Sequence, residues 1–343
     1  MHQWLQRLFS AFSEPRFFQA QPGAVPLVMP ARPAPPAPDA TIAYRDDVSA
    51  AYYGWLFDRQ DDSNLELTPQ EIDVINALEA VVHSKQSGAA LVGRLPGVIP
   101  QLLQSLRSDN FSGTQIARKI SSDVVLVAAV IRLANSAMQN RNNTITSVEH
   151  AVIVIGQEGL RQLVATVAFR PIVDLKSGHF TRTLMPRIQN QSERCAIANR
   201  VLAEQLGIDP FQAFLCGLVQ NVGLVVSLRM MDKIAKDKRQ LGSAVFCASL
   251  AYNARLLACS IGREWHFPDA VIVAIEEQLG SHVSYSPLGR LLSMTDYFSK
   301  VRILVQQSRL ADDPDLFQGL PDPVQRCYLT LSALEENTRH ERP

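Results

Sequence analysis

The sequence predicts an all-α protein, with many short helices around one core and a flexible N-terminal arm ahead of them. The first observation is that helix start signals recur along the chain. In LTPQEI, Thr68 is a candidate N-cap, with Pro69 at the first helical position and Glu71 completing a capping box. In GIDPFQAF, Asp209 and the proline after it repeat the pattern. Such signals predict where helices begin.

The second and third observations concern helix ends and the thin evidence for strands. Glycines 156, 207 and 280 fall where the predicted helices would stop. The apolar run VVLVAAVI (124–131) is β-branched, but it continues into RLANSA and outlasts a typical strand. There are no alternating hairpin patterns and no regular repeat. We therefore interpret this run as a buried helix.

Composition narrows the class of protein. The chain has 343 residues, of which 47% are apolar, so it can bury a sizeable core. Its 33 basic residues balance 33 acidic ones, which argues against nucleic acid as the main partner, although a local basic patch stays possible. The five cysteines include no C-x-x-C pair, so we interpret them as reduced core residues rather than a disulfide framework.

The sequence also bears on membrane association and compartment. The longest apolar run, 124–131, is far shorter than the roughly 18 residues that a membrane span needs. The N-terminal segment is a poor signal peptide, because Gln6 and Arg7 interrupt its apolar residues. We therefore expect a cytoplasmic protein without a transmembrane span.

Four regions follow from the patterning. Residues 1–45 form the arm: an amphipathic start over 1–19 with Trp4, Leu5, Leu8, Phe9 and Phe12 at helical spacing, then a proline- and alanine-rich linker. The amphipathic start would contact a membrane face or partner, dock on the protein itself, or stay disordered. Residues 46–92 form a helical lead-in packed on the core, where AYYGWLF (51–57) is expected to dock. Residues 93–305 form the main domain, and 306–343 form a C-terminal helical segment and tail.

Several motifs in the main domain carry a resemblance. They are the opening LPGVIP from Leu95, VIRLANSA (130–137), ITSVEHAVIVIG (145–156) and the G-x-x-x-L-R-x-L-V run from Gly156. Together they resemble the HDOD domain, a bacterial signalling module related to the HD and HD-GYP phosphohydrolases. The resemblance implies a multi-helix HD-like bundle. We expect Asn135 and Ser136 in the second motif to bond the backbone, a structural role.

The resemblance also implies that a metal site has been lost. Where the catalytic relatives have a His-Asp pair, the stretch GLVQNVG has Gln220 and Asn221. The preceding metal-ligating His falls at Gln191, and the closing Asp matches Asp296. The extra His-His of the HD-GYP branch falls at Glu277 and Gln278. Only Asp296 of the four core positions is a good ligand, so we expect no metal, no cofactor and no catalytic residue.

The residues themselves support this interpretation. Gln191 shares a helical stripe with Ile188, Cys195, Ala198 and Leu202, so it should face inward, and Asn221 continues the stripe of Phe214 and Leu218. An amide oxygen carries no charge to offset a dication. We expect the amides to bond one another across helices as a polar strut. Asp296 is then expected to be a buried acid bonded to Gln191, Asn221 or a neighbouring basic group.

Three functions stay open. The first is a non-catalytic regulatory module, with the histidine kinases, response regulators or cyclic-di-GMP enzymes that the resemblance implies as partners. The second is a phosphohydrolase with a displaced metal site built from Asp296 and Glu277, with Glu276 or His282. The third is a small-ligand sensor in which the amides at 191, 220 and 221 bind a base edge or a ribose hydroxyl.

Overall fold

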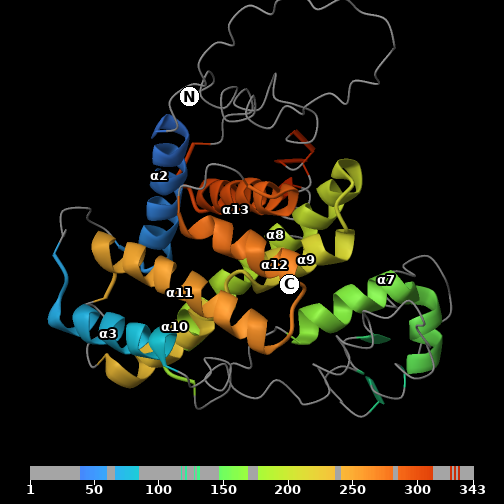
Figure 1. Cartoon of the computed structure of the whole chain (residues 1–343), viewed down its shortest axis with the longest axis horizontal. Coiled ribbons are helices and arrows are strands. Elements are labelled where there is room, and N and C mark those ends of the chain that lie inside the picture. Colours follow the sequence, from blue (N-terminus) through green and yellow to red (C-terminus); the bar gives the residue numbers. More distant parts are fainter. Residues whose placement is uncertain are drawn as a thin grey trace, which may run out of the picture.

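The computed structural model describes residues 39–59, 66–84, 147–168, 177–235, 241–280 and 285–311, with single helical positions within 117–131 and 325–332. Within these ranges every regular element is a helix, which confirms the all-α prediction (Figure 1). The elements are α2 (Asp39–Leu56), α3 (Pro69–His83), α7 (Val148–Ala168), α8 (His179–Leu206), α9 (Pro210–Val219), α10 (Val222–Ile234), α11 (Ala244–Glu264), α12 (Asp269–Glu276), the 3-10 turn η3 (Glu277–Leu279) and α13 (Pro287–Gln306).

The long helix α8 organises the core, because α9, α10 and α13 all pack against it. Its predicted inward stripe is confirmed, since Ile188, Cys195, Ala198 and Leu202 are all buried. The helices α8 and α9 approach closely at Gly217, where a Cβ atom would lie 2.6 Å from the backbone nitrogen of Ala196. A side chain at position 217 would therefore push the two helices apart.

The predicted start and stop signals are confirmed where the structure describes them. The hydroxyl of Thr68 accepts from the backbone N–H of Glu71, and the carboxylate of Glu71 accepts from the backbone N–H of Thr68. The side chain of Asp209 accepts from the N–H of Gln212 at 2.9 Å. All three glycines lie at helix breaks. Gly207 ends α8 with φ 66°, Gly156 interrupts α7 with φ 72°, and Gly280 follows η3.

The lead-in helices are bound to the core by one buried carboxylate and a group of aromatic side chains. Glu71, 1% exposed, also accepts from the backbone N–H of Gly242 and of Ser243, each at 2.8 Å, and so joins α3 to the start of α11. In α2, Tyr52 and Tyr53 are buried in the core cluster, which confirms core docking of AYYGWLF. The helix α2 begins at Asp39, so the predicted arm of 1–45 overlaps its first residues.

Other expectations fall on positions that lie outside the described residues. These are the amphipathic start over 1–19, the linker up to residue 38, most of 124–131, Asn135, Ser136, His282 and the tail after residue 332.

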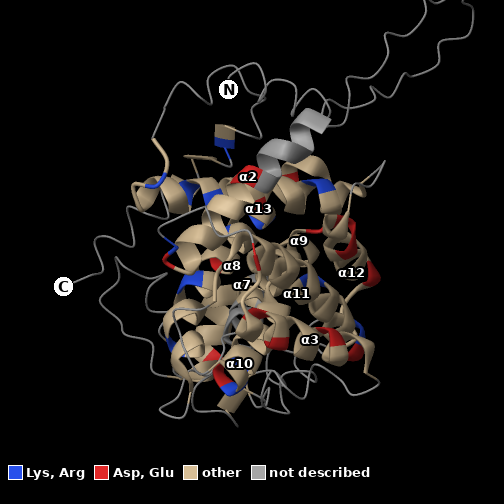
Figure 2. Ribbon diagram, turned by 90° about the vertical axis from the view of Figure 1, so that its left-hand side faces the viewer, with Lys and Arg blue, Asp and Glu red and all other residues tan. Residues whose placement is uncertain are grey.

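Two stretches have the length and hydropathy of a membrane span, which corrects the expectation that none approaches it. They are Pro210–Ile234 and Ala244–Glu264, whose most apolar windows are 89% and 50% buried inside the protein. Packing in the core accounts for much of this apolar character, because α9, α10 and α11 each pack against several neighbouring helices. Charged residues of both signs are spread over the ribbon, with acidic positions on α3 and α12 (Figure 2). We see no dominant basic stripe in the described residues.

Candidate functional site

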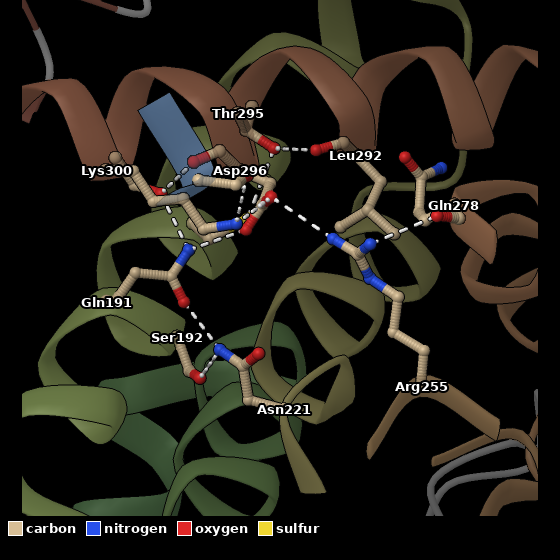
Figure 3. Close-up of polar contacts among 12 residues, drawn as sticks. Gln191, Ser192, Asn221, Arg255, Gln278, Leu292, Thr295, Asp296 and Lys300 are labelled. Atoms are coloured by element: carbon tan, nitrogen blue, oxygen red, sulfur yellow. Dashed lines mark hydrogen bonds and ion pairs between the residues drawn. The ribbon is translucent and has the colours of Figure 1, made fainter. Parts of the chain in front are cut away.

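A cluster of polar side chains lies where α8, the turn between α9 and α10, and α13 meet (Figure 3). Gln191 on α8 is at its centre and is fully buried. Its amide nitrogen donates to Oδ1 of Asp296 and to Oγ of Ser299, both at 2.9 Å. Its amide oxygen accepts from Nδ2 of Asn221 at 2.5 Å, and the same Asn221 nitrogen donates to Oγ of Ser192 at 2.9 Å. The predicted bonding of amides across helices is confirmed for Gln191 and Asn221.

Two cations from different helices face the carboxylate of Asp296. The ammonium of Lys300, one turn further along α13, donates to Oδ2 at 2.7 Å. The guanidinium of Arg255 on α11 lies 3.7 Å from the same oxygen, and its other terminal nitrogen donates to the backbone carbonyl of Gln278 at 3.1 Å. The side chains of Asp296 and Lys300 are 9% and 5% exposed, so this ion pair is buried. This confirms that Asp296 is a buried acid bonded to Gln191 and a basic group.

A second polar layer fixes the same three helices next to the cluster. The hydroxyl of Thr295, the residue before Asp296, donates to the side-chain oxygen of Asn199 on α8 at 2.6 Å. The amide nitrogen of Asn199 donates to the carbonyl of Ala213 on α9 at 3.0 Å. All these groups are buried, so their bonds restrict the relative positions of α8, α9 and α13.

The helix α2 packs against α13 beside the cluster, and a short blue piece of its ribbon is visible near Lys300 and Asp296 in Figure 3. The ammonium of Lys300 donates to Oγ of Ser49 at 3.3 Å. It lies 5.7 Å from the ring centroid of Tyr52 and 6.0 Å from that of Tyr53, within cation–π range. Burial raises the pKa of both phenols well above their ordinary value, and the negative charge of Asp296 adds to this. Both tyrosines are therefore neutral over the physiological range.

Two of the predicted site residues do not join the cluster. The carboxylate of Glu277 accepts from the N–H and the hydroxyl of Ser286, both at 2.8 Å, so it supports the start of α13 rather than a metal site. Gln220 is buried at the end of α9, and its amide nitrogen has no hydrogen-bond partner among the described residues. The displaced metal site of Asp296 with Glu277 gains no support, because the carboxylate of Glu277 already binds the start of the next helix. Glu276, its other candidate, forms an ion pair with Arg263.

The donor set does not fit the metal that the resemblance associates with this position. The cluster offers one carboxylate, two amides and hydroxyl groups, and an ammonium already contacts the carboxylate. A dication there would meet the positive charge of Lys300 and too few anionic ligands to offset its own. Among the residues that the structure describes, no three or more His, Cys, Asp or Glu side chains come together as a metal site would require.

Sequence reasoning expected a basic group beside Asp296 but identified neither of the two cations. The sequence could have indicated Lys300 as the partner of Asp296, because it follows Asp296 by four positions on one helix, the spacing of intrahelical ion pairs. No sequence pattern indicates Arg255, since it lies on another helix and only packing brings it to Asp296.

Comparison with known proteins identifies the family of the chain. Residues 92–280 match the family model of the HDOD domain. A solved protein of Shewanella amazonensis SB2B, named as a candidate metal-dependent phosphohydrolase, is 18% identical, with a TM-score of 0.52 over 78% of this chain and 99% of that one. An HDOD domain protein of unknown function from Geobacter sulfurreducens is 15% identical, with a TM-score of 0.51 over 79% and 95% of the two chains. At these identities the similarity shows the fold.

A sequence relative gives no activity either. An uncharacterized protein of Treponema pallidum (strain Nichols) is 24% identical over 218 residues, which cover 61% of this chain and 42% of that protein. The match therefore spans less than half of the relative. Asp296 and Lys300 lie beyond residue 280, and α2 precedes residue 92, so the cluster combines the family domain with helices on both sides of the match. Because the family model covers more than half of its length, the chain belongs to the HDOD domain family.

Proposed function

We propose that this protein is a non-catalytic regulatory module of bacterial signal transduction that acts in the cytoplasm by binding other proteins. The observation that carries the proposal is the contact between the ammonium of Lys300 and Oδ2 of Asp296 at 2.7 Å. The one acidic residue kept from the family's metal ligands is neutralised by a cation of the chain itself. A buried carboxylate that is paired in this way holds helices together and is not free to bind a metal.

The amides add to this argument. Gln191 uses both amide hydrogens and its oxygen to bridge Asp296, Ser299 and Asn221. Each bond joins side chains from different segments, so the cluster acts as a polar strut through the domain. The strut maintains the arrangement of the helices without metal ligands. A protein-binding module requires a stable surface, and this arrangement provides it.

The family resemblance indicates which partners to test first: histidine kinases, response regulators or cyclic-di-GMP enzymes. Co-purification with the tagged full-length chain from its native host should then recover the same signalling protein reproducibly. Failure to recover any protein would contradict the proposal. The variant Asp296→Asn distinguishes specific from non-specific binding. It disturbs the strut, so binding of a specific partner should be lost or weakened.

The metal content of the purified, chelator-free protein tests the other half of the proposal. We expect less than about a tenth of an equivalent of any transition metal, because the donor set carries one neutralised carboxylate. A near-stoichiometric metal would overturn the proposal and favour a phosphohydrolase.

A second candidate, a small-ligand sensor, rests on Gln220. Its amide nitrogen is buried without a partner among the described residues, and an unmet donor costs about 1–3 kcal/mol that a ligand acceptor could recover. A thermal shift with a nucleotide panel that disappears in Gln220→Leu would favour this function. If no nucleotide of the panel changed the melting temperature, the protein-binding module would remain the favoured function.

A further inference from the structure

The outward face of α11 is apolar although it lies at the protein surface. The most apolar window of Ala244–Glu264 is 50% buried, against 89% for the window of α9 and α10. Val245 and Tyr252 are 41% and 51% exposed. Together with the exposed Ala248 and the half-buried Leu256 they recur every three or four positions, and we call these four residues the α11 stripe. A surface helix normally carries polar side chains on its outward face, so the stripe indicates a surface that another segment covers.

A pocket lies at the C-terminal end of the α11 stripe. Arg263 follows Leu256 by seven positions, so it continues the stripe, and it contributes to the wall of the pocket. The pocket has a volume of about 450 Å³ and is lined by Arg263, His266, Phe267, Pro268, Asp269 and Ile272. Phe267 and Ile272 are buried, so the deep part of its wall is apolar. An apolar stripe that leads to such a pocket suits a helix that carries an aromatic anchor.

The amphipathic segment 1–19 has the side chains that this face requires. Its apolar residues at helical spacing include three aromatic ones, Trp4, Phe9 and Phe12. A helix that ended before Pro15 would be about 20 Å long, and the α11 stripe spans about 17 Å from its first to its last residue. The segment is therefore long enough to cover the stripe, and it supplies the aromatic anchor for the pocket.

The connection through α2 allows the segment to reach α11. The helix α2 has 18 residues, so its start lies about 27 Å from its end. Its end meets the start of α11, because the ring centroids of Phe57 and Phe246 are 5.8 Å apart. Residues 20–38 can extend to about 60 Å, roughly twice the length of α2. A tether of this kind holds a segment at an effective concentration of about 1 mM, so even a weak contact is formed.

Charge also favours this occupant. The helices α3 and α12 both pack against α11, and they carry the exposed acidic residues Asp73, Glu79 and Asp269 (Figure 2). The cation of Arg263 is already paired with Glu276. Segment 1–19 has two arginines and one acidic residue, so its net charge is opposite to that of these flanking helices.

We propose that residues 1–19 dock as a helix on the α11 stripe and place one of their aromatic side chains in the pocket. The contact folds the N-terminal arm back onto its own domain. This inference goes beyond the proposed function, because it assigns an occupant to a surface outside the polar cluster. A partner or a membrane that binds the segment must then displace it from α11.

Hydroxyl-radical oxidation of the full-length protein, followed by mass spectrometry, measures whether this face is covered. The oxidation of Tyr252 on the stripe and of His266 at the pocket is divided by that of Leu206, which is exposed at the end of α8. Leu8→Gln with Phe12→Gln removes apolar side chains of the segment, so both ratios should rise at least about threefold. The matched control is Gln6→Asn with Ser10→Asn, on the opposite side of the same helix, and it should leave both ratios unchanged.

A change on α11 tests the same contact from the other side. Val245→Gln with Tyr252→Gln replaces exposed side chains, so the fold should be retained. The oxidation of His266 should then rise at least about threefold, because docking is weakened although neither substituted residue lines the pocket. An unchanged oxidation of His266 in this variant would overturn the proposal. Unchanged ratios in Leu8→Gln with Phe12→Gln would overturn it as well.

Dilution and lipid distinguish the other possible occupants. Docking within one chain does not depend on protein concentration, so the wild-type ratios should stay constant when the protein is diluted about tenfold. A rise on dilution would mean that a second copy of the chain covers the face, which would contradict the proposal. Protection that arises only with vesicles of anionic phospholipid would mean that a membrane covers it, which would contradict the proposal equally.

Discussion

The ammonium of Lys300 lies 2.7 Å from Oδ2 of Asp296, four positions earlier on α13, and the two side chains are 5% and 9% exposed. A buried lysine without a counter-charge would be costly, and so would a buried aspartate. Each residue therefore makes the burial of the other tolerable.

This pairing predicts strong coupling between the two positions. Asp296→Asn should lower the free energy of unfolding by about 3–5 kcal/mol, because it leaves the charge of Lys300 buried and unpaired. The double variant Asp296→Asn with Lys300→Met should be clearly more stable than the sum of the single losses predicts. Urea unfolding of the four proteins measures the coupling.

The exposed pair of Arg187 and Asp58 is the matched control for this cycle. Its side chains are 29% and 64% exposed, so Asp58→Asn should cost less than about 1 kcal/mol. An equally large loss of stability in Asp58→Asn would contradict the view that burial makes the pair of Asp296 and Lys300 strong. Strict additivity of the changes at Asp296 and Lys300 would contradict it as well.

A second prediction concerns the recovery of metal binding. Restoring the ligands that the resemblance indicates, by Gln191→His, Gln220→His and Asn221→Asp, should not restore stoichiometric metal while Lys300 remains. Adding Lys300→Met should raise the bound metal by at least several-fold, because it removes the competing cation. Elemental mass spectrometry of both variants decides the matter. Equal metal content with and without Lys300 would show that its charge does not control the site.

Glu71 should be among the most sensitive positions of the lead-in. Its carboxylate accepts four hydrogen bonds, from Thr68, Gly242 and both the N–H and the hydroxyl of Ser243. Glu71→Gln turns acceptors into a donor opposite N–H groups, so it should lower the free energy of unfolding by about 3 kcal/mol. Urea unfolding checks this. Glu79→Gln, at an exposed position on the same helix, should change stability by less than about 0.5 kcal/mol.

Alkaline pH should weaken the packing of the buried tyrosines. Burial raises the pKa of Tyr52, Tyr53 and Tyr297 in the folded protein, whereas the phenols of the unfolded chain titrate near pH 10. Above about pH 10 the unfolded state therefore binds fewer protons than the native state, and the free energy of unfolding falls as pH rises. Below about pH 10 these phenols leave the free energy of unfolding unchanged.

Urea unfolding from pH 8 to 11, with absorbance at 295 nm as the reporter of phenolate, measures this dependence. The double variant Tyr52→Phe with Tyr53→Phe should show a shallower decline, with the remainder due to Tyr297. An unchanged slope in that variant would show that these two phenols do not titrate with unfolding.

Close helix contact makes a last prediction. Gly217→Ala should destabilise the protein by about 1–3 kcal/mol, because the new Cβ would lie 2.6 Å from the backbone of Ala196. Gly280→Ala is the control, since nothing lies within 4 Å of its added Cβ and its φ of −160° suits any residue. Thermal unfolding should show a lower melting temperature for Gly217→Ala and an unchanged or higher one for Gly280→Ala.

The sequence by itself determined the fold class and much of the cluster. Capping residues such as Thr68 and Asp209 act within one turn, so their signals can be interpreted locally, and both were confirmed. The stripe of Gln191 with Ile188 and Cys195 predicted an inward amide, because helical periodicity fixes which face a residue shares. Family-pattern positions then indicated that Asn221 and Asp296 would meet it.

Only the tertiary structure decided what surrounds Asp296. Arg255 reaches it from α11, and Ser49, Tyr52 and Tyr53 cover its partner Lys300 from α2, across separations in sequence that no local pattern spans. The same packing separated Glu277 from the cluster, since its carboxylate supports the start of α13 through Ser286. Local rules determine which face of a helix a residue occupies, whereas the relative placement of helices determines which charges come together.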